Sequence, residues 1–129
     1  MITLFVVQSC ADAKDPKASI DSFAGLEGEV HLVKSLDEIN GTDSKHDWYG
    51  VIYDDEHIDE QLLEGLKVFI EHTNADALVL YRMKGGDKAS RSPRLFRENI
   101  TLGKGSLMPE GEVKFETVLN GWVMSNDKS

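Results

Sequence analysis

The hydrophobic residues of the chain fall into short runs separated by polar stretches. Four of these runs have the length of a buried strand and are rich in β-branched and aromatic residues. We expect strands near residues 2–8, 29–34, 48–53 and 77–82.

Between these runs the apolar spacing changes to that of helices. Residues 58–73 form the clearest case, because their apolar positions make one stripe around a helix: Ile58, Leu62, Leu63, Leu66, Phe69 and Ile70. A short helix is predicted to open at Pro16 and run through Phe23. Ser35 followed by Glu38 predicts a capping box on a single helical turn.

The spacing of hydrophobic and polar residues changes in the C-terminal third. Gly85–Ser90 is predicted to be a loop and Pro93–Phe96 a short strand. Apolar and polar residues alternate over 113–119, and Asn120-Gly121 then predicts a hairpin turn. The alternative is a helix from about residue 110 that ends at Gly121.

Strands that alternate with helices are typical of a parallel sheet built from βαβ units. We therefore predict one compact α/β domain over residues 1–129, with a mainly parallel sheet, flanking helices and antiparallel C-terminal strands. Residues 125–129 are expected to be a frayed tail.

Composition limits the environment and the partners. The chain has one cysteine, Cys10, no apolar tract long enough to cross a bilayer and no signal-peptide pattern, so we expect a cytoplasmic protein without a membrane span. A formal charge of −9 argues against nucleic-acid binding. Residues 82–104 nevertheless carry seven basic residues against two acidic ones, a pattern that suits either an anion or a solvated surface.

Three consecutive acids, Asp54-Asp55-Glu56, follow the strand over residues 48–53. Ligands of open α/β sheets bind just beyond the carboxyl ends of the strands, so these acids are candidates for holding Mg²⁺ or Mn²⁺ with a bound phosphate. The alternative is structural, because a carboxylate also caps a helix and favours its positive end. Both interpretations remain open at this point.

The succession of motifs adds a family resemblance. The run 47–58, the helix after it, the segment 75–79 and the segment 93–97 together resemble the middle of a short or degenerate family 2 glycosyltransferase of the GT-A type. The resemblance covers about residues 47–100 and implies a nucleotide-diphospho-sugar transferase-like fold. It also implies a nucleotide sugar bound through Mn²⁺ or Mg²⁺.

The same resemblance implies roles for particular residues. Asp54 and Glu56 would be metal ligands, with Asp55 between them at the cofactor. Gln8 and Ser9 would face the nucleotide base and ribose. Two arginines, Arg94 and Arg97, match a recurrent element of the family, and a guanidinium fork suits phosphate.

The predicted function is therefore a glycosyltransferase-like protein that binds a nucleotide sugar. No catalytic base is identified, because no motif distinguishes Glu110, Glu112 and Glu116. The alternative is a non-catalytic interaction or assembly module on the same fold.

Overall fold

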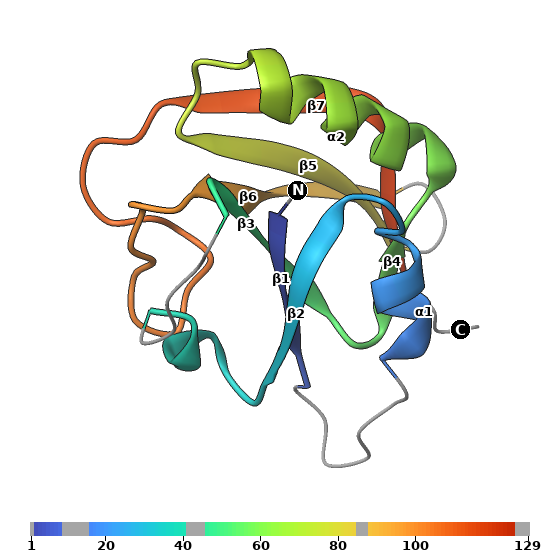
Figure 1. Ribbon diagram of the computed structural model, residues 1–129, viewed down its shortest axis with the longest axis horizontal. Helices are drawn as coiled ribbons and strands as arrows, with labels where there is room; N and C mark the ends of the chain where they lie inside the picture. Colours follow the sequence, from blue (N-terminus) through green and yellow to red (C-terminus); the bar gives the residue numbers. More distant parts are fainter. Residues whose placement is uncertain (1, 9–15, 41–45, 85–87, 126–129) are drawn as a thin grey trace.

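A mixed β-sheet is the main feature of the computed structural model, which describes residues 2–8, 16–40, 46–84 and 88–125. The strands lie in the order β2-β1-β3-β6-β5-β7-β4 (Figure 1). They are β1 (Ile2–Val7), β2 (Glu27–Val33), β3 (Trp48–Tyr53), β4 (Glu56–Ile58), β5 (Ala77–Lys84), β6 (Lys88–Arg97) and β7 (Phe115–Ser125). The helical elements are α1 (Lys17–Asp21), a 3-10 turn (Leu36–Glu38) and α2 (Glu60–His72).

The prediction of a mainly parallel sheet with flanking helices is wrong. The pairs β1–β2, β1–β3 and β5–β7 are parallel, whereas β3–β6, β5–β6 and β4–β7 are antiparallel. The sheet also curls: β4 follows β3 after two residues, yet it pairs with β7 at the other end of the strand order. β4, the last strand in the strand order, is thereby brought back beside β3, the third.

The segment after β5 explains much of this error. Residues 85–90 are predicted to form a loop and 93–96 a short strand, but β6 pairs with β5 from Ala77↔Phe96 to Lys84↔Lys88. The exposed end of β6, Ala89 to Arg91, has no large or β-branched apolar residue, so the sequence pattern does not indicate a strand there. Residues 85–87, which connect the two strands, lie outside the described residues.

The predicted hairpin at Asn120-Gly121 is also wrong, and so is its helical alternative. β7 runs through both residues, and its pairing with β5 jumps from Leu80↔Val118 to Arg82↔Val123. The extra residues form a bulge in which Gly121 has φ +94°. Gly121 does have the positive φ expected of the glycine, but in a bulge rather than in a turn.

The helix predictions are confirmed in type, with changes at the ends. α2 begins two residues later than predicted because Glu56–Ile58 forms β4, and the Asp59 carboxylate caps the helix by accepting the Leu62 N–H at 2.9 Å. α1 follows Pro16, and the capping box of Ser35 and Glu38 is present. Within the described ranges no helix is long and apolar enough to span a membrane.

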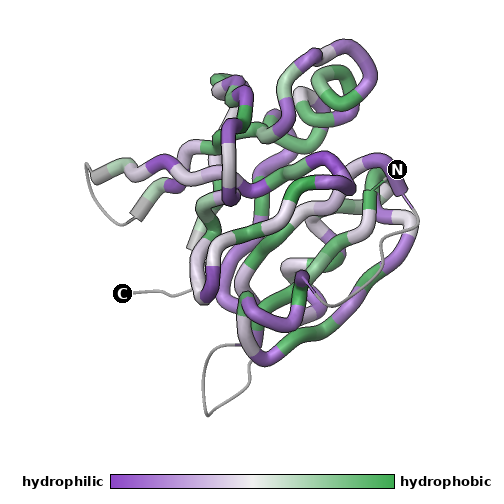
Figure 2. Tube along the Cα trace, turned by 90° about the vertical axis from the view of Figure 1, so that its left-hand side faces the viewer, coloured by the Kyte–Doolittle hydropathy of each residue, from purple (hydrophilic) through white to green (hydrophobic). Residues whose placement is uncertain are grey.

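Apolar side chains pack on both faces of the sheet. Figure 2 shows hydrophobic stretches along neighbouring strands, and an alternation of hydrophobic and hydrophilic residues around α2. One cluster joins Leu4, Ile52 and Leu78 to Leu62 and Leu66 of α2. The second cluster lies on the other face and includes Phe5, Val51, Tyr49, Phe96, Ile39 and Leu102. The predicted tail of residues 125–129 begins one residue too early, because Ser125 is the last residue of β7 and pairs with Glu56; residues 126–129 lie outside the described residues.

Candidate functional site

The carboxyl ends of three parallel strands meet at one edge of the sheet. β1 lies between β2 and β3, and all three run in the same direction. The N–H of Gln8 donates to the carbonyl of Val33 at 2.8 Å, and the N–H of Asp54 donates to the carbonyl of Val7 at 3.0 Å. These bonds fix Gln8 and Asp54 at the same edge.

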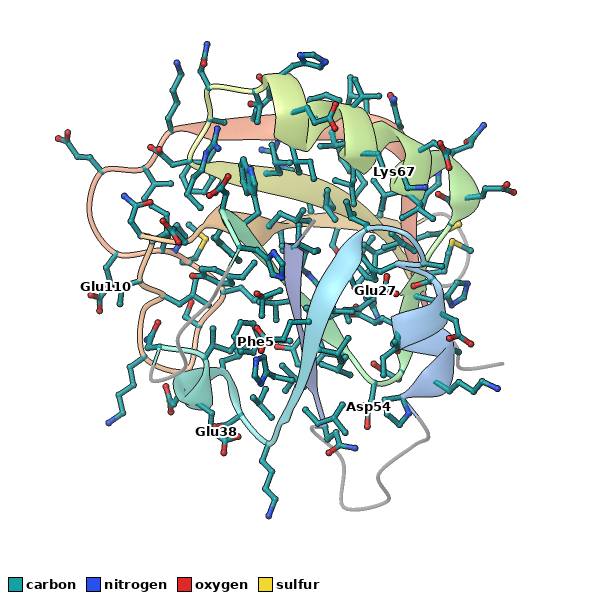
Figure 3. The ribbon with its side chains drawn as sticks, viewed as in Figure 1. Phe5, Glu27, Glu38, Asp54, Lys67 and Glu110 are labelled. Atoms are coloured by element: carbon teal, nitrogen blue, oxygen red, sulfur yellow. The ribbon has the colours of Figure 1, made fainter. Side chains whose placement is uncertain are left out.

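The chain leaves this edge in two directions. From β1 it continues to α1 and then to β2 on one side, whereas from β3 it continues through β4 and α2 to β5 on the other side. Open α/β sheets place their ligands where neighbouring connections diverge, and among the described strands of this mixed sheet only the parallel trio β2-β1-β3 has that arrangement. Figure 3 shows Asp54 at the turn between β3 and β4, at the end of the molecule where β1 also ends.

Asp54 is buried without a hydrogen-bond partner. Its residue surface is 1% exposed, and neither carboxylate oxygen has a partner in the part of the chain that the structure describes. Burying a carboxylate without a compensating bond is costly, so such groups call for a separate explanation such as an ion or a ligand. Both carboxylate oxygens of Asp54 are therefore unoccupied by donors of the described chain.

Glu56 is in the opposite situation. Its carboxylate Oε1 accepts Arg94 Nη1 at 2.7 Å and the Tyr53 N–H at 3.0 Å, while Oε2 accepts Arg94 Nη2 at 3.0 Å. Arg82 Nε also donates to Oε2. Both oxygens of the predicted metal ligand are thus occupied by donors of the protein itself.

Charge pairing sets the ionisation of Glu56. Burial of the side chain would raise its pKa, but the hydrogen bonds and positive charge of Arg94, together with the Tyr53 N–H and Arg82, hold that pKa below its ordinary value. Glu56 is consequently an anion fixed between two guanidinium groups.

Arg94 lies at the site but has its donors engaged. Besides Glu56, it donates from Nε to Ser92 Oγ at 2.9 Å, and its guanidinium lies 5.5 Å from the centre of the Tyr53 ring. Its side chain is 6% exposed. Arg94 therefore supports Glu56 and has little capacity for a further anion.

The structure does not bring Arg97 to this edge. Arg97 pairs with Trp48 at the beginning of β3, the end opposite to Asp54. Its guanidinium lies 4.2 Å from the Trp48 ring centre and donates to the carbonyls of Thr73 and Ala75. These contacts connect the end of α2 to the sheet.

The other candidate residues are placed as follows. Gln8 and Asp55 are half-buried near the edge, and Ser9 lies outside the described residues. Glu110 lies on the far side of the molecule from Asp54 (Figure 3), and Glu116 accepts a bond from Thr73 Oγ1 at the start of β7. No group of three or more potential metal ligands occurs within the described ranges.

Two residues that hold this site were missed by the sequence analysis. Ser19 of α1 donates its hydroxyl to the carbonyls of Tyr53 and Glu56, which fixes the turn between β3 and β4. Arg82 of β5 contacts Glu56 from the other side. The basic excess that begins at Arg82 was the available indication, but sequence spacing does not relate β5 to β4.

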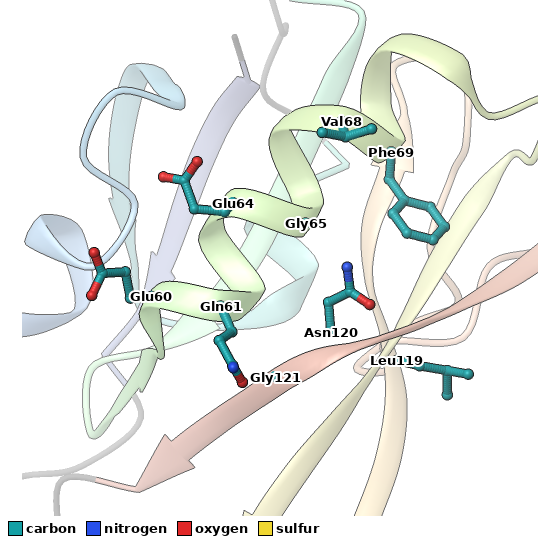
Figure 4. Close-up of a pocket in the computed structure, with 9 residues that line it drawn as sticks. All are labelled: Glu60, Gln61, Glu64, Gly65, Val68, Phe69, Leu119, Asn120 and Gly121. Atoms are coloured by element: carbon teal, nitrogen blue, oxygen red, sulfur yellow. The ribbon is translucent and has the colours of Figure 1, made fainter.

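The structure also has a groove that the sequence pattern does not indicate. It lies between α2 and the β7 bulge and has a volume of about 780 Å³ (Figure 4). Val68 and Leu119 are 58% and 73% exposed, and Glu60 and Glu64 add negative charge to the lining. Asn120 points from β7 toward α2, where Gly65 leaves room for it.

Comparison with known proteins gives no family for this chain. Neither the scan against family models nor the search of curated proteins returns a match.

Proposed function

We propose that the protein binds a nucleotide sugar with Mn²⁺ or Mg²⁺ at the carboxyl ends of β1 and β3, and that Asp54 is the metal ligand. The observation that carries the proposal is the burial of Asp54 without a partner at the point where the chain connections diverge. Mg²⁺ is commonly held by one or two carboxylates together with substrate phosphates, so a single free carboxylate fits this chemistry.

This proposal assigns Glu56 a different role from the one its sequence position implies. Because both of its oxygens accept bonds from arginine, Glu56 acts here as the anchor of Arg94, which is buried, and of Arg82, which is partly exposed. A divalent ion held at Asp54 would neutralise charge on the diphosphate of the sugar nucleotide, which assists its departure in a transfer reaction. The proposal covers binding of the donor; it names no catalytic base.

Calorimetry tests this proposal directly. UDP-sugars and GDP-sugars would be titrated into wild type, Asp54→Asn and Asp21→Asn, with Mn²⁺ and with EDTA. Asp21→Asn is the matched control, because it removes the same charge from an exposed residue of α1. We expect Mn²⁺-dependent binding in wild type and in the control and its loss in Asp54→Asn. Equal binding by all three proteins, or no binding by wild type, contradicts the proposal.

The α2–β7 groove favours a second candidate, a non-catalytic interaction module. Exposed Val68 and Leu119 offer apolar contact, and Glu60 and Glu64 favour a partner segment that carries lysine or arginine beside apolar residues. This candidate requires that no nucleotide sugar binds and that Leu119→Ser, rather than Asp54→Asn, removes binding of a synthetic Leu/Lys amphipathic peptide.

A further inference from the structure

Glu56 does not need Arg82 for its own pairing. Arg94 already binds both carboxylate oxygens in a bidentate arrangement, and the Tyr53 N–H provides a third donor. A buried carboxylate paired in this way is fully compensated in charge and well supplied with hydrogen bonds. Arg82 is therefore an additional cation beside an ion pair that is already complete.

The additional charge is poorly solvated. The side chains of Glu56, Arg94 and Arg82 are 2%, 6% and 19% exposed, and together they carry one net positive charge. Holding an uncompensated guanidinium mostly out of water costs free energy. The cost would be offset if this positive charge were used to bind an anion.

Arg82 also has hydrogen-bond donors that Glu56 does not use. Its Nε is used by Glu56, while its two Nη groups have no partner among the residues that the structure describes. The bond at Nε fixes the plane of the guanidinium, which leaves the Nη edge preorganised. Asp54 makes no hydrogen bond to Arg82, because its carboxylate oxygens are without partners in the described part of the chain.

We propose that Arg82 is an anion-binding residue whose Nη edge takes a phosphate group of the ligand, and that Glu56 is the positioning residue that orients it. A guanidinium fork matches two oxygens of a phosphate at once, and the partial exposure of Arg82 gives a phosphate access that Arg94 lacks. Identifying this group as the diphosphate of a nucleotide sugar rests on the proposed function above; the anion site itself does not.

The test uses inorganic pyrophosphate in EDTA, so that no metal contributes. Wild type, Arg82→Gln and Arg91→Gln would be titrated by calorimetry at low ionic strength. Arg91→Gln is the control, because it removes the same charge from an exposed residue of the neighbouring β6. We expect Arg82→Gln to weaken binding by about tenfold or more, in line with the loss of charged hydrogen bonds, and Arg91→Gln to change it little. Equal affinities of the two variants overturn the proposal.

Two further measurements separate this proposal from folding effects and from the proposed function. In wild type, the side-chain NMR signals of Arg82 should shift during the pyrophosphate titration, and an unchanged Arg82 spectrum contradicts the site whether or not the variant folds. Asp54→Asn should keep metal-free pyrophosphate binding. If pyrophosphate binds through Arg82 but no nucleotide sugar binds with Mn²⁺, the proposed function fails and the anion site stands.

Discussion

Arg94 holds the carboxylate of Glu56 through two parallel hydrogen bonds, 2.7 Å from Nη1 to Oε1 and 3.0 Å from Nη2 to Oε2. The pair joins β6 to β4, two strands that are far apart in the strand order. Because both side chains are buried, this ion pair fixes the curl of the sheet from the inside.

Removing Arg94 should be much more harmful than removing Arg82. We expect Arg94→Met to lower the free energy of unfolding by about 3 kcal/mol, because it leaves Glu56 buried with incomplete pairing. Arg82→Gln should change it by less than about 1 kcal/mol, because Arg94 still binds both oxygens and the loss of one hydrogen bond is offset by the removal of a poorly solvated charge. Urea unfolding of both variants measures the difference, and equal losses would contradict the unequal roles assigned here.

Stability should fall at acid pH through Glu56. The pKa of this carboxyl is lowered in the folded protein, so its contribution is fully present above the unfolded-state pKa of about 4.3 and is lost as pH falls through the lower folded-state pKa. Urea unfolding of wild type should show this loss below about pH 4.3. In Glu56→Gln this part of the pH dependence should be absent, and an unchanged acid profile would argue against a charged Glu56.

The buried Asp54 carboxylate should lower the stability of the folded protein when no ligand is present. We expect Asp54→Asn to raise the melting temperature in EDTA, because it removes a buried charge that has no hydrogen-bond partner. Differential scanning calorimetry measures this change, with Asp21→Asn as the exposed control. A lower melting temperature in Asp54→Asn would indicate that the residue stabilises the turn.

Gly121 should be irreplaceable, whereas Gly111 should tolerate alanine better. A Cβ at Gly121 would lie 2.2 Å from Asp59 Oδ1 and 2.6 Å from the Leu62 nitrogen, and the φ of Gly121 is +94°. Gly111 has φ +81° but no atom within 4 Å of its added Cβ. We expect Gly111→Ala to cost about 1 kcal/mol from backbone strain alone and Gly121→Ala more than that. Gly111→Ala measures backbone strain alone, whereas Gly121→Ala measures backbone strain together with the steric clash of the added Cβ. Thermal unfolding of the two variants compares these effects.

Asp59 is the residue that caps α2, so none of the acids Asp54–Glu56 has the helix-capping role that the sequence left open for them. Asp59 Oδ1 accepts the N–H groups of Leu62 and Trp122, so Asp59→Ala should cost about 2 kcal/mol through the lost cap and the lost bond to the β7 bulge. Asp59→Asn retains an accepting oxygen and should lose less. Similar losses in both variants would show that charge, and not the hydrogen bonds, is responsible.

The local elements followed from the sequence. The stripe from Leu62 to Phe69 determined α2, and the apolar runs determined the positions of β1, β3 and most of β5. These features depend on the spacing of apolar residues over a few positions, which the chain displays directly. The acidic segment at Asp54 was likewise visible as a candidate site.

Only the tertiary structure decided how those elements combine. The hydrophobic pattern does not contain strand direction, so it could not show that β6 runs antiparallel or that β4 pairs with β7. Nor could it show that Glu56 is occupied by Arg82 and Arg94, residues 26 and 38 positions away, while Asp54 has no described partner. The physical reason is that ion pairing and burial depend on which distant segments meet, and sequence spacing records only neighbours along the chain.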